Sequence, residues 1–168
     1  MSNARTSSSA GLDQARMRQV MGHFATGVTV VTASHDGVPV GMACQSFTSL
    51  SLDPAYISIA PALTSTTYPR VRTAGRFVVN VLAEDQQDLC RAMGRSGGDK
   101  FAGVDWTPAD NGAPRLAGAL AWIECDIAHE LPGGDHVIVI GAVTALDLPR
   151  DTAPLLFHRG RYARLVAE

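Results

Sequence analysis

The chain has 168 residues, of which 46% are hydrophobic and 18% are charged, which is enough apolar sequence for one compact domain with a core. The formal net charge is -2 and Lys and Arg are scattered, so no nucleic-acid partner is expected. No window approaches the roughly 20 apolar residues of a membrane helix, so no membrane contact is expected. The polar N-terminus lacks the apolar core of a signal peptide. We expect a cytoplasmic protein with a disordered tail over residues 1–11 and one domain over residues 12–168.

A helix and a hairpin are expected to open the domain. Residues 13–24 predict a helix with an apolar stripe, because Asp13 is a suitable N-cap. The β-branched segment GVTVVT at 27–32 predicts a strand. The Asp-Gly pair at 36–37 signals a tight turn, after which 38–43 returns as a strand. Pro39 indicates that this second strand lies at an edge.

Strands and short helices alternate in the middle of the chain. The alternating segment YISIA at 56–60 predicts a strand. Hydroxyl residues at 64–67 precede a short helix that Gly75 is expected to end. The apolar segment at 77–82 predicts a further strand, and residues 85–93 predict a third helix.

The remaining pattern predicts the fold class. A glycine-rich loop at 95–98 is followed by strands at 120–129 and 137–146, joined by a turn at 132–135. Two short strands, at 155–158 and 162–166, close the chain. Because the strands mostly follow one another by hairpins, we expect a mainly β protein with an antiparallel barrel and a few helices outside it. No GxGxxG opens a helix after a strand, so a Rossmann nucleotide site is not indicated.

Three cysteines, Cys44, Cys90 and Cys125, are widely spaced and form no CxxC pair. This pattern supports neither a zinc site nor a disulfide framework, and no metal site is expected. Cys90 and Cys125 lie in apolar segments and are expected to be small core residues. Cys44 has polar neighbours and is expected to line a site or to pack, not to act as a nucleophile.

The segment GMACQSFTSLSLDP at 41–54 is unusual for a core strand, because hydroxyl and amide side chains replace the expected Val, Ile and Leu. Small polar groups and accessible backbone suit a planar ligand with polar edges. The alternative, equally weighted from spacing alone, is a bulge and loop in which Ser and Thr bond to nearby backbone.

Three further segments have a functional and a structural interpretation. Residues 59–61 with the hydroxyls at 64–67 suit a phosphate, although helix capping is the commoner use of such hydroxyls. In 99–101, Lys100 can add charge to a phosphate site and Phe101 can pack on a ring, although a loop with Phe101 in the core is favoured. The GGDH segment at 133–136 lets a turn approach a ligand with His136 beside it, although a plain hairpin turn is more common.

The ordered set of segments resembles the flavin reductase-like family, whose fold is the antiparallel split β-barrel. The segments are FATGVTVVT at 24–32, GMACQSFTSLSLDP at 41–54, FVVNVL at 77–82, DKFAGV at 99–104, GGDH at 133–136 and PLLF at 154–157. Together they cover almost all of the chain after the N-terminal tail.

The resemblance implies an NAD(P)H:flavin oxidoreductase that supplies diffusible reduced flavin to a separate monooxygenase, with FAD or FMN and NADH or NADPH as small-molecule partners. It also implies a homodimer. Carried over by position, Ala43, Cys44, Gln45 and Ser46 would line the isoalloxazine ring, while Ser49, Ile59, Ala60 and Pro61 would hold the ribityl chain. Ser65 and Thr66 would bind phosphate with Lys100 and Phe101 nearby. His136 would face the nicotinamide as the catalytic residue, and Tyr162 would approach the same pocket.

One departure from the family pattern concerns the phosphate turn, because residues 64–67 contain no Arg. A looser hold on phosphate would suit a reductase that releases its product. The ACQSF run at 43–47 resembles reductases that use FAD, and no Arg cluster for a 2′-phosphate is visible, which favours FAD and NADH. Two alternatives stay open: a flavin- or haem-binding barrel without turnover, and a flavoenzyme that acts on its own substrate.

Overall fold

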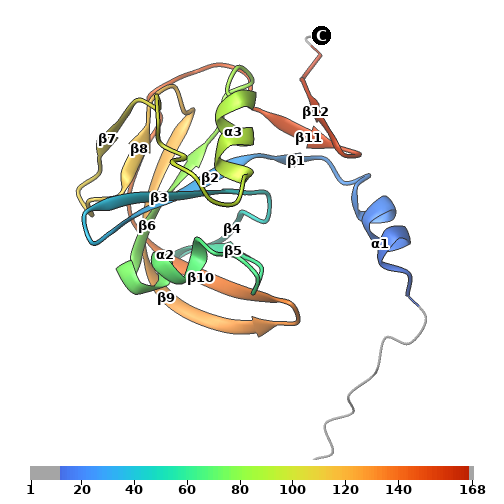
Figure 1. Cartoon of the computed structure of the whole chain (residues 1–168), viewed down its shortest axis with the longest axis horizontal. Helices are drawn as coiled ribbons and strands as arrows, with labels where there is room; N and C mark the ends of the chain where they lie inside the picture. The colour runs from blue at the N-terminus through green and yellow to red at the C-terminus, as the bar shows by residue number, and fades with distance from the viewer. Residues whose placement is uncertain (1–11, 167–168) are drawn as a thin grey trace, which may run out of the picture.

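The computed structural model describes residues 12–166, so the tail expected over residues 1–11 lies outside the described residues. Its main element is a curved antiparallel sheet of seven strands (Figure 1). In spatial order the strands are β3 (Val38–Cys44), β2 (Thr29–His35), β6 (Arg76–Val81), β9 (Ala121–Gly133), β10 (His136–Asp147), β5 (Ala55–Ile59) and β4 (Thr48–Leu52). The smaller sheets are β1 (Thr26–Gly27) with β11 (Leu156–His158) and β12 (Arg161–Ala163), and β7 (Trp106–Pro108) with β8 (Pro114–Leu116).

Two helices pack against the β2–β3 hairpin and bury its apolar side chains. Helix α2 (Tyr68–Ala74) packs on β2 and places Tyr68 and Val71 in the main core with Phe77 and Val79. Helix α3 (Gln87–Gly94) packs on β3 and places Met93 in a second core cluster. Strand β2 is buried along five successive residues, Thr29 to Ala33, because core clusters lie on both of its faces.

The mainly β, antiparallel fold with short flanking helices is confirmed, but the sheet does not close into a barrel. Among the described strands, β3 and β4 form the two ends and each pairs on one side only. The edge position expected from Pro39 is therefore correct. Asp13 caps α1 (Gln14–Met21), because its Oδ1 accepts from Ala15 N at 3.0 Å. Gly75 ends α2 with a φ of 71°, which favours glycine.

Several boundaries differ from the sequence predictions. Helix α1 ends at Met21 instead of Phe24, because Gly22 caps it and the chain then turns toward β1. Strands β4, β7 and β8 were not expected, since β4 lies in the polar segment at 41–54 that was interpreted as a ligand-binding segment or a bulge and loop, and β7 and β8 have three residues each. The last strand, β12, ends at Ala163 instead of continuing to residue 166.

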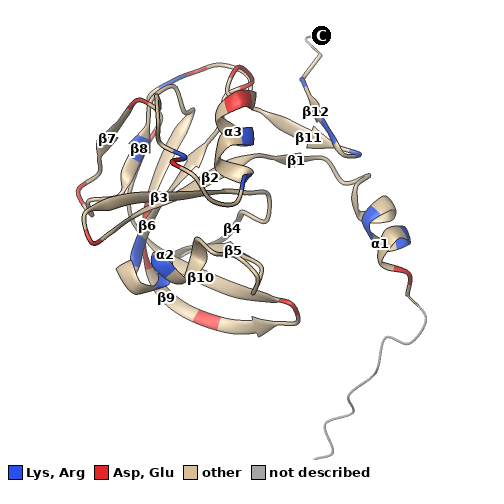
Figure 2. Ribbon diagram, viewed as in Figure 1, with Lys and Arg blue, Asp and Glu red and all other residues tan. Residues whose placement is uncertain are grey.

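The burial of the cysteines and the scatter of the charged residues agree with the expectations from the sequence. All three cysteines are free and buried, with Cys90 and Cys125 in the core clusters as expected. Acidic and basic residues are dispersed over the sheet and helices (Figure 2). None of the helices in the described part of the chain is long and apolar enough to span a membrane.

Gly141 on β10 is required by close packing in the core. A Cβ atom there would lie 2.8 Å from Phe77 Cζ, 3.1 Å from Cys125 Cβ and 3.2 Å from Ile57 Cδ1. We expect Gly141→Ala to lower the free energy of unfolding by about 1–3 kcal/mol, because the neighbours are themselves packed. Urea denaturation measures this, with Gly27→Ala as the matched control, since nothing lies within 4 Å of a Cβ at Gly27. Equal effects of the two substitutions would contradict the packing argument.

Candidate functional site

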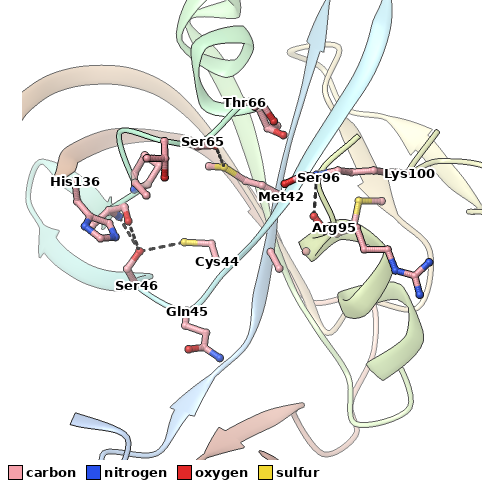
Figure 3. Close-up of a pocket in the computed structure, with 18 residues that line it drawn as sticks. Met42, Cys44, Gln45, Ser46, Ser65, Thr66, Arg95, Ser96, Lys100 and His136 are labelled. Carbon is pink, nitrogen blue, oxygen red and sulfur yellow. Dashed lines mark hydrogen bonds between the residues drawn. The ribbon is translucent and has the colours of Figure 1, made fainter. Parts of the chain in front are cut away.

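A cavity of about 450 Å³ opens where the end of β3, the β5–α2 connection and the loop after α3 meet. Figure 3 shows its labelled side chains, with His136 and Lys100 on opposite sides. Three of the segments singled out from the sequence therefore meet at one place, together with the GGDH turn. The lining of the cavity includes sulfur and methyl groups as well as hydroxyl, amide and cationic groups.

The polar connection after β3 is held in place by Ser46. Its Oγ accepts from Ala60 N at 2.8 Å and donates to Ala60 O at 3.3 Å, and it also lies 3.2 Å from Cys44 Sγ. The Ser46 hydroxyl thus satisfies the backbone N–H and C=O of Ala60, as a neighbouring strand would, and fixes the turn beside Pro61. The backbone N–H groups of Gln45 and Ser46 donate to no acceptor among residues 12–166. Both residues are exposed and line the cavity.

The hydroxyl residues before α2 divide into one cap and several unpaired groups. Ser65 Oγ accepts from Tyr68 N at 3.1 Å, so the capping interpretation is correct for this residue. It also lies 3.8 Å from Met42 Sδ. The side chains of Thr64 and Thr66 make no hydrogen bond within the described part of the chain, and both line the cavity. They remain able to bind a ligand oxygen.

Lys100 has a structural contact that the sequence did not predict. Its Nζ donates to Gly41 O at 3.1 Å and to Met93 O at 3.0 Å, and burial lowers the pKa of this ammonium group. These bonds fasten the loop after α3 to β3 and use two of the three N–H donors. One donor remains for a ligand.

His136 begins β10 at the rim of the cavity. Its Nδ1 lies 2.7 Å from Asp135 Oδ1, and this hydrogen bond lowers the pKa of the Asp135 carboxyl. The backbone around it is also fixed, because Leu63 N donates to Asp135 O and Val137 N donates to Pro61 O, each at 2.9 Å. The imidazole is therefore carried on a paired backbone while 44% of its side chain is exposed.

The structure brings most of the predicted site residues together. Those that line the cavity are Ala43, Cys44, Gln45, Ser46, Ala60, Pro61, Ser65, Thr66, Lys100 and His136. The others lie elsewhere: Ser49 is exposed on β4, Ile59 is in the core, and Phe101 and Tyr162 pack against the second core cluster. The ring of Tyr162 packs edge-on against Phe157 at 5.4 Å. The ligand contacts expected of all fourteen residues stay predictions.

The sequence analysis missed several lining residues. These are Met42, Ala62, Thr64, Thr67, Met93, Gly94, Arg95 and Ser96. Thr64 and Thr67 belong to the hydroxyl segment at 64–67, which was interpreted as a phosphate site or as helix caps, but neither was predicted individually as a site residue. Met42 was detectable, because it stands two residues before Cys44 on one strand and so shares its face. Met93, Arg95 and Ser96 gave no such signal, since only the packing of α3 on β3 brings them to the cavity.

An ion-pair cluster lines a second cavity together with His136. Arg72 Nε donates to both carboxylate oxygens of Glu130, at 2.8 and 2.9 Å, and Tyr68 OH donates to the same carboxylate. The Arg72 hydrogen bond holds the pKa of Glu130 below its ordinary value of 4.5, and burial raises the pKa of Tyr68.

The lowered pKa of Glu130 predicts a pH dependence of stability. A depressed folded-state pKa stabilises the protein above pH 4.5, and this contribution is lost as the pH falls through the folded-state value. We expect Glu130→Gln to be less stable than the native protein at neutral pH, with the difference shrinking below pH 4.5. Urea denaturation over this range measures it. A difference that stays constant with pH would contradict the ionic role of Glu130.

The open antiparallel sheet, the short flanking helices and a cavity lined by hydroxyl, amide and cationic groups are typical of split-barrel proteins. The family model for the flavin reductase like domain matches residues 21–166. The chain belongs to this family.

Similar proteins agree with this membership. The reductase subunit HsaB of a flavin-dependent monooxygenase from Rhodococcus jostii is 48% identical, covering 90% of this chain and 77% of that protein. A flavin reductase from Pseudomonas putida is 41% identical over 94% of each chain. Among solved structures, nitrilotriacetate monooxygenase component B from Mycobacterium thermoresistibile superimposes with a TM-score of 0.89 at 45% identity, covering 92% of this chain and 87% of that one. NADH:FAD oxidoreductase SgcE6 from Streptomyces globisporus, solved in complex with NAD and FAD fragments, superimposes with a TM-score of 0.87 at 37% identity. The match covers 92% of this chain and 93% of that one.

Proposed function

We propose that this protein is an NAD(P)H:flavin oxidoreductase that transfers hydride from NADH to FAD or FMN and supplies diffusible reduced flavin to a separate monooxygenase. The observation that carries the proposal is the pair of unpaired N–H donors at Gln45 and Ser46, held rigidly by the Ser46–Ala60 bonds beside an open cavity. Family membership and the relatives' roles as reductase subunits support it.

The residues of the cavity fit a flavin. Ala43, Cys44, Gln45 and Ser46 would line the isoalloxazine ring, with the two N–H donors at its polar edge. Ala60 and Pro61 would hold the ribityl chain, together with Ser49 and Ile59 if the ligand reaches their backbone. The free hydroxyl of Thr66, the Ser65 hydroxyl and the remaining donor of Lys100 would hold the phosphate, with Phe101 behind them. Bound flavin supplies an acceptor for hydride, which the side chains of the protein lack.

His136 would place the nicotinamide against the flavin. Hydride transfer requires the donor and acceptor rings to stack at near-attack distance, so a fixed imidazole at the rim restricts where the second ring can lie. Asp135 holds Nδ1 of the imidazole, which leaves Nε2 for the cavity side. Tyr162 would reach this pocket only from another protomer or after a movement, because it lies in the second core cluster.

Steady-state NADH oxidation tests the proposal, followed with no flavin, with FAD and with FMN. Turnover that rises with added flavin and saturates is the expected result. A protein that binds flavin but consumes no NADH would be the binding protein of the first alternative. A protein that holds tightly bound flavin and turns over without added flavin would be the self-sufficient flavoenzyme of the second.

A homodimer would explain the unusual N-terminal helix. Helix α1 stands apart from the large sheet (Figure 1), contains no buried residue, and exposes Met17, Val20 and Met21 with the following Phe24. A second copy of the chain would cover this stripe. Sedimentation velocity is expected to show a dimer that Met21→Asp weakens, while Gln19→Asp on the same helix leaves it intact.

The cytoplasmic location stays a prediction, which cell fractionation tests.

A further inference from the structure

Three sulfur-containing side chains line the cavity of the proposed flavin site: Met42 and Cys44 on β3, and Met93 on α3. They differ in accessibility. Met93 has 0% of its surface exposed and Cys44 has 7%, whereas Met42 is half-buried. Met42 stands two residues before Cys44 on the same strand, so it shares the face that is placed above at the isoalloxazine ring. Its thioether is therefore the sulfur group that a reagent formed in the cavity meets first.

Met42 also contacts the phosphate end of the site. Ser65 Oγ donates to Met42 Sδ at 3.8 Å, and Figure 3 shows this contact as a dashed line. The same oxygen accepts from Tyr68 N at 3.1 Å, so its single O–H is the donor that can reach a ligand phosphate. A thioether sulfur is a weak acceptor, which leaves this O–H free to turn to a stronger one.

The proposed reaction supplies an oxidant to this cavity when no monooxygenase takes up the reduced flavin. Dioxygen takes two electrons and two protons from reduced flavin and becomes hydrogen peroxide. One peroxide oxygen can then bond to Met42 Sδ while the O–O bond breaks. The sulfur loses two electrons and becomes a sulfoxide, and the other oxygen leaves as water with both protons. A sulfoxide is polar, and its oxygen accepts hydrogen bonds where the thioether was apolar.

We propose that Met42 is a modification site, at which peroxide formed in the cavity converts the thioether to a sulfoxide and so lowers the affinity of the site for flavin. The inference rests on the proposed function. The sulfoxide oxygen takes the Ser65 O–H that a flavin phosphate would otherwise accept. A reductase that makes reduced flavin faster than it is consumed is thereby slowed. A methionine sulfoxide reductase, with a thiol as reductant, restores it.

The first experiment maps oxidation without NADH. FAD is reduced photochemically under argon and mixed with the protein in air with catalase, and each methionine is followed by peptide mass spectrometry. Because catalase removes peroxide from solution, Met42 is expected to oxidise before Met17 and Met21, although those side chains are 52% and 61% exposed. Protein mixed with oxidised FAD in air is the control, in which Met42 stays a thioether. Oxidation of Met17 and Met21 ahead of Met42 would overturn the inference.

The second experiment measures flavin binding by equilibrium dialysis, before and after treatment with hydrogen peroxide, and compares each protein with itself. Peroxide is expected to raise the dissociation constant of FAD about tenfold for the native protein, through the loss of the Ser65 hydrogen bond. Met42→Leu nearly conserves volume and has no sulfur, so its constant is expected to change less than about twofold. Met17→Leu is the matched control and is expected to respond as the native protein does. An equal rise in the native protein and Met42→Leu would contradict the role of Met42.

Neither experiment uses NADH, so the two claims fail separately. Preferential oxidation of Met42 in a protein that consumes no NADH would remove the proposed reductase activity and keep the modification site. Flavin-dependent NADH turnover in a protein whose Met42 is spared would remove the modification site and keep the reductase. A protein that binds no flavin would remove both.

Discussion

A His136→Ala variant is expected to lose about 10- to 100-fold in kcat/KM for NADH while its flavin dissociation constant changes only a few-fold. The imidazole stands at the rim of the cavity on a backbone that is paired with residues 61–63, and Asp135 fixes its Nδ1. Its removal would let the nicotinamide occupy many orientations, of which few bring the rings to reacting distance. Stopped-flow reduction of bound flavin by NADH measures the step directly.

His129→Ala is the matched control for this prediction. His129 lies on β9 of the same hairpin, packs edge-on against Tyr56 and lines none of the cavities described above. We expect its rate of flavin reduction to match that of the native protein. An unchanged rate in His136→Ala would remove the histidine from nicotinamide positioning.

An Asn80→Ala variant is expected to lose about 3 kcal/mol of folding free energy, a larger effect than any surface substitution proposed here. Asn80 is fully buried on β6. Its Nδ2 donates to Val30 O at 3.1 Å and to Thr32 Oγ1 at 3.0 Å, and its Oδ1 accepts from Leu116 N at 2.8 Å. Alanine would leave the N–H of Leu116 without its acceptor in the buried core and would remove the side-chain hydrogen bonds to Val30 O and Thr32 Oγ1. Urea denaturation at neutral pH measures the loss.

Thr32 allows a sharper form of the same experiment. Thr32 Oγ1 receives the Asn80 bond and donates to Pro114 O at 2.5 Å, so the two side chains form one network between β2, β6 and β8. In a double-mutant cycle, Asn80→Ala and Thr32→Val are expected to be non-additive, because the second change removes a partner that the first has already disconnected. Additive losses would contradict the network.

The sequence predicted those elements whose burial follows a simple period. Strand β6 carries the apolar residues Phe77, Val78 and Val79 in succession because core clusters lie on both of its faces. The turn at residues 36–37 is set by an Asp-Gly pair with φ of 52° and 76°. The gathering of Gly41–Ser46, Ala60–Thr66 and His136 followed from a family resemblance, because segments so far apart in the chain give no local signal of their proximity.

The remaining features depend on tertiary packing. The charge of Lys100 predicted a phosphate contact, but two backbone carbonyls that the fold places beside it take most of its donors. Ser46 was predicted as a ligand contact, and nothing in the sequence indicated that its hydroxyl bonds to Ala60 and leaves the backbone N–H as the group without a partner in residues 12–166. The side chains of strand β4 are mostly exposed, and these include Leu50 and Leu52, so burial does not explain its pairing with β5.

Anaerobic reduction of free FAD by NADH tests the central claim most directly, with the flavin in large molar excess over the protein and its visible absorbance followed over time. If the protein is a reductase that exchanges its flavin, it will bleach the whole flavin pool at a rate proportional to protein concentration. Bleaching that stops after one equivalent of flavin per protein, or that never exceeds the rate without protein, would contradict the assignment.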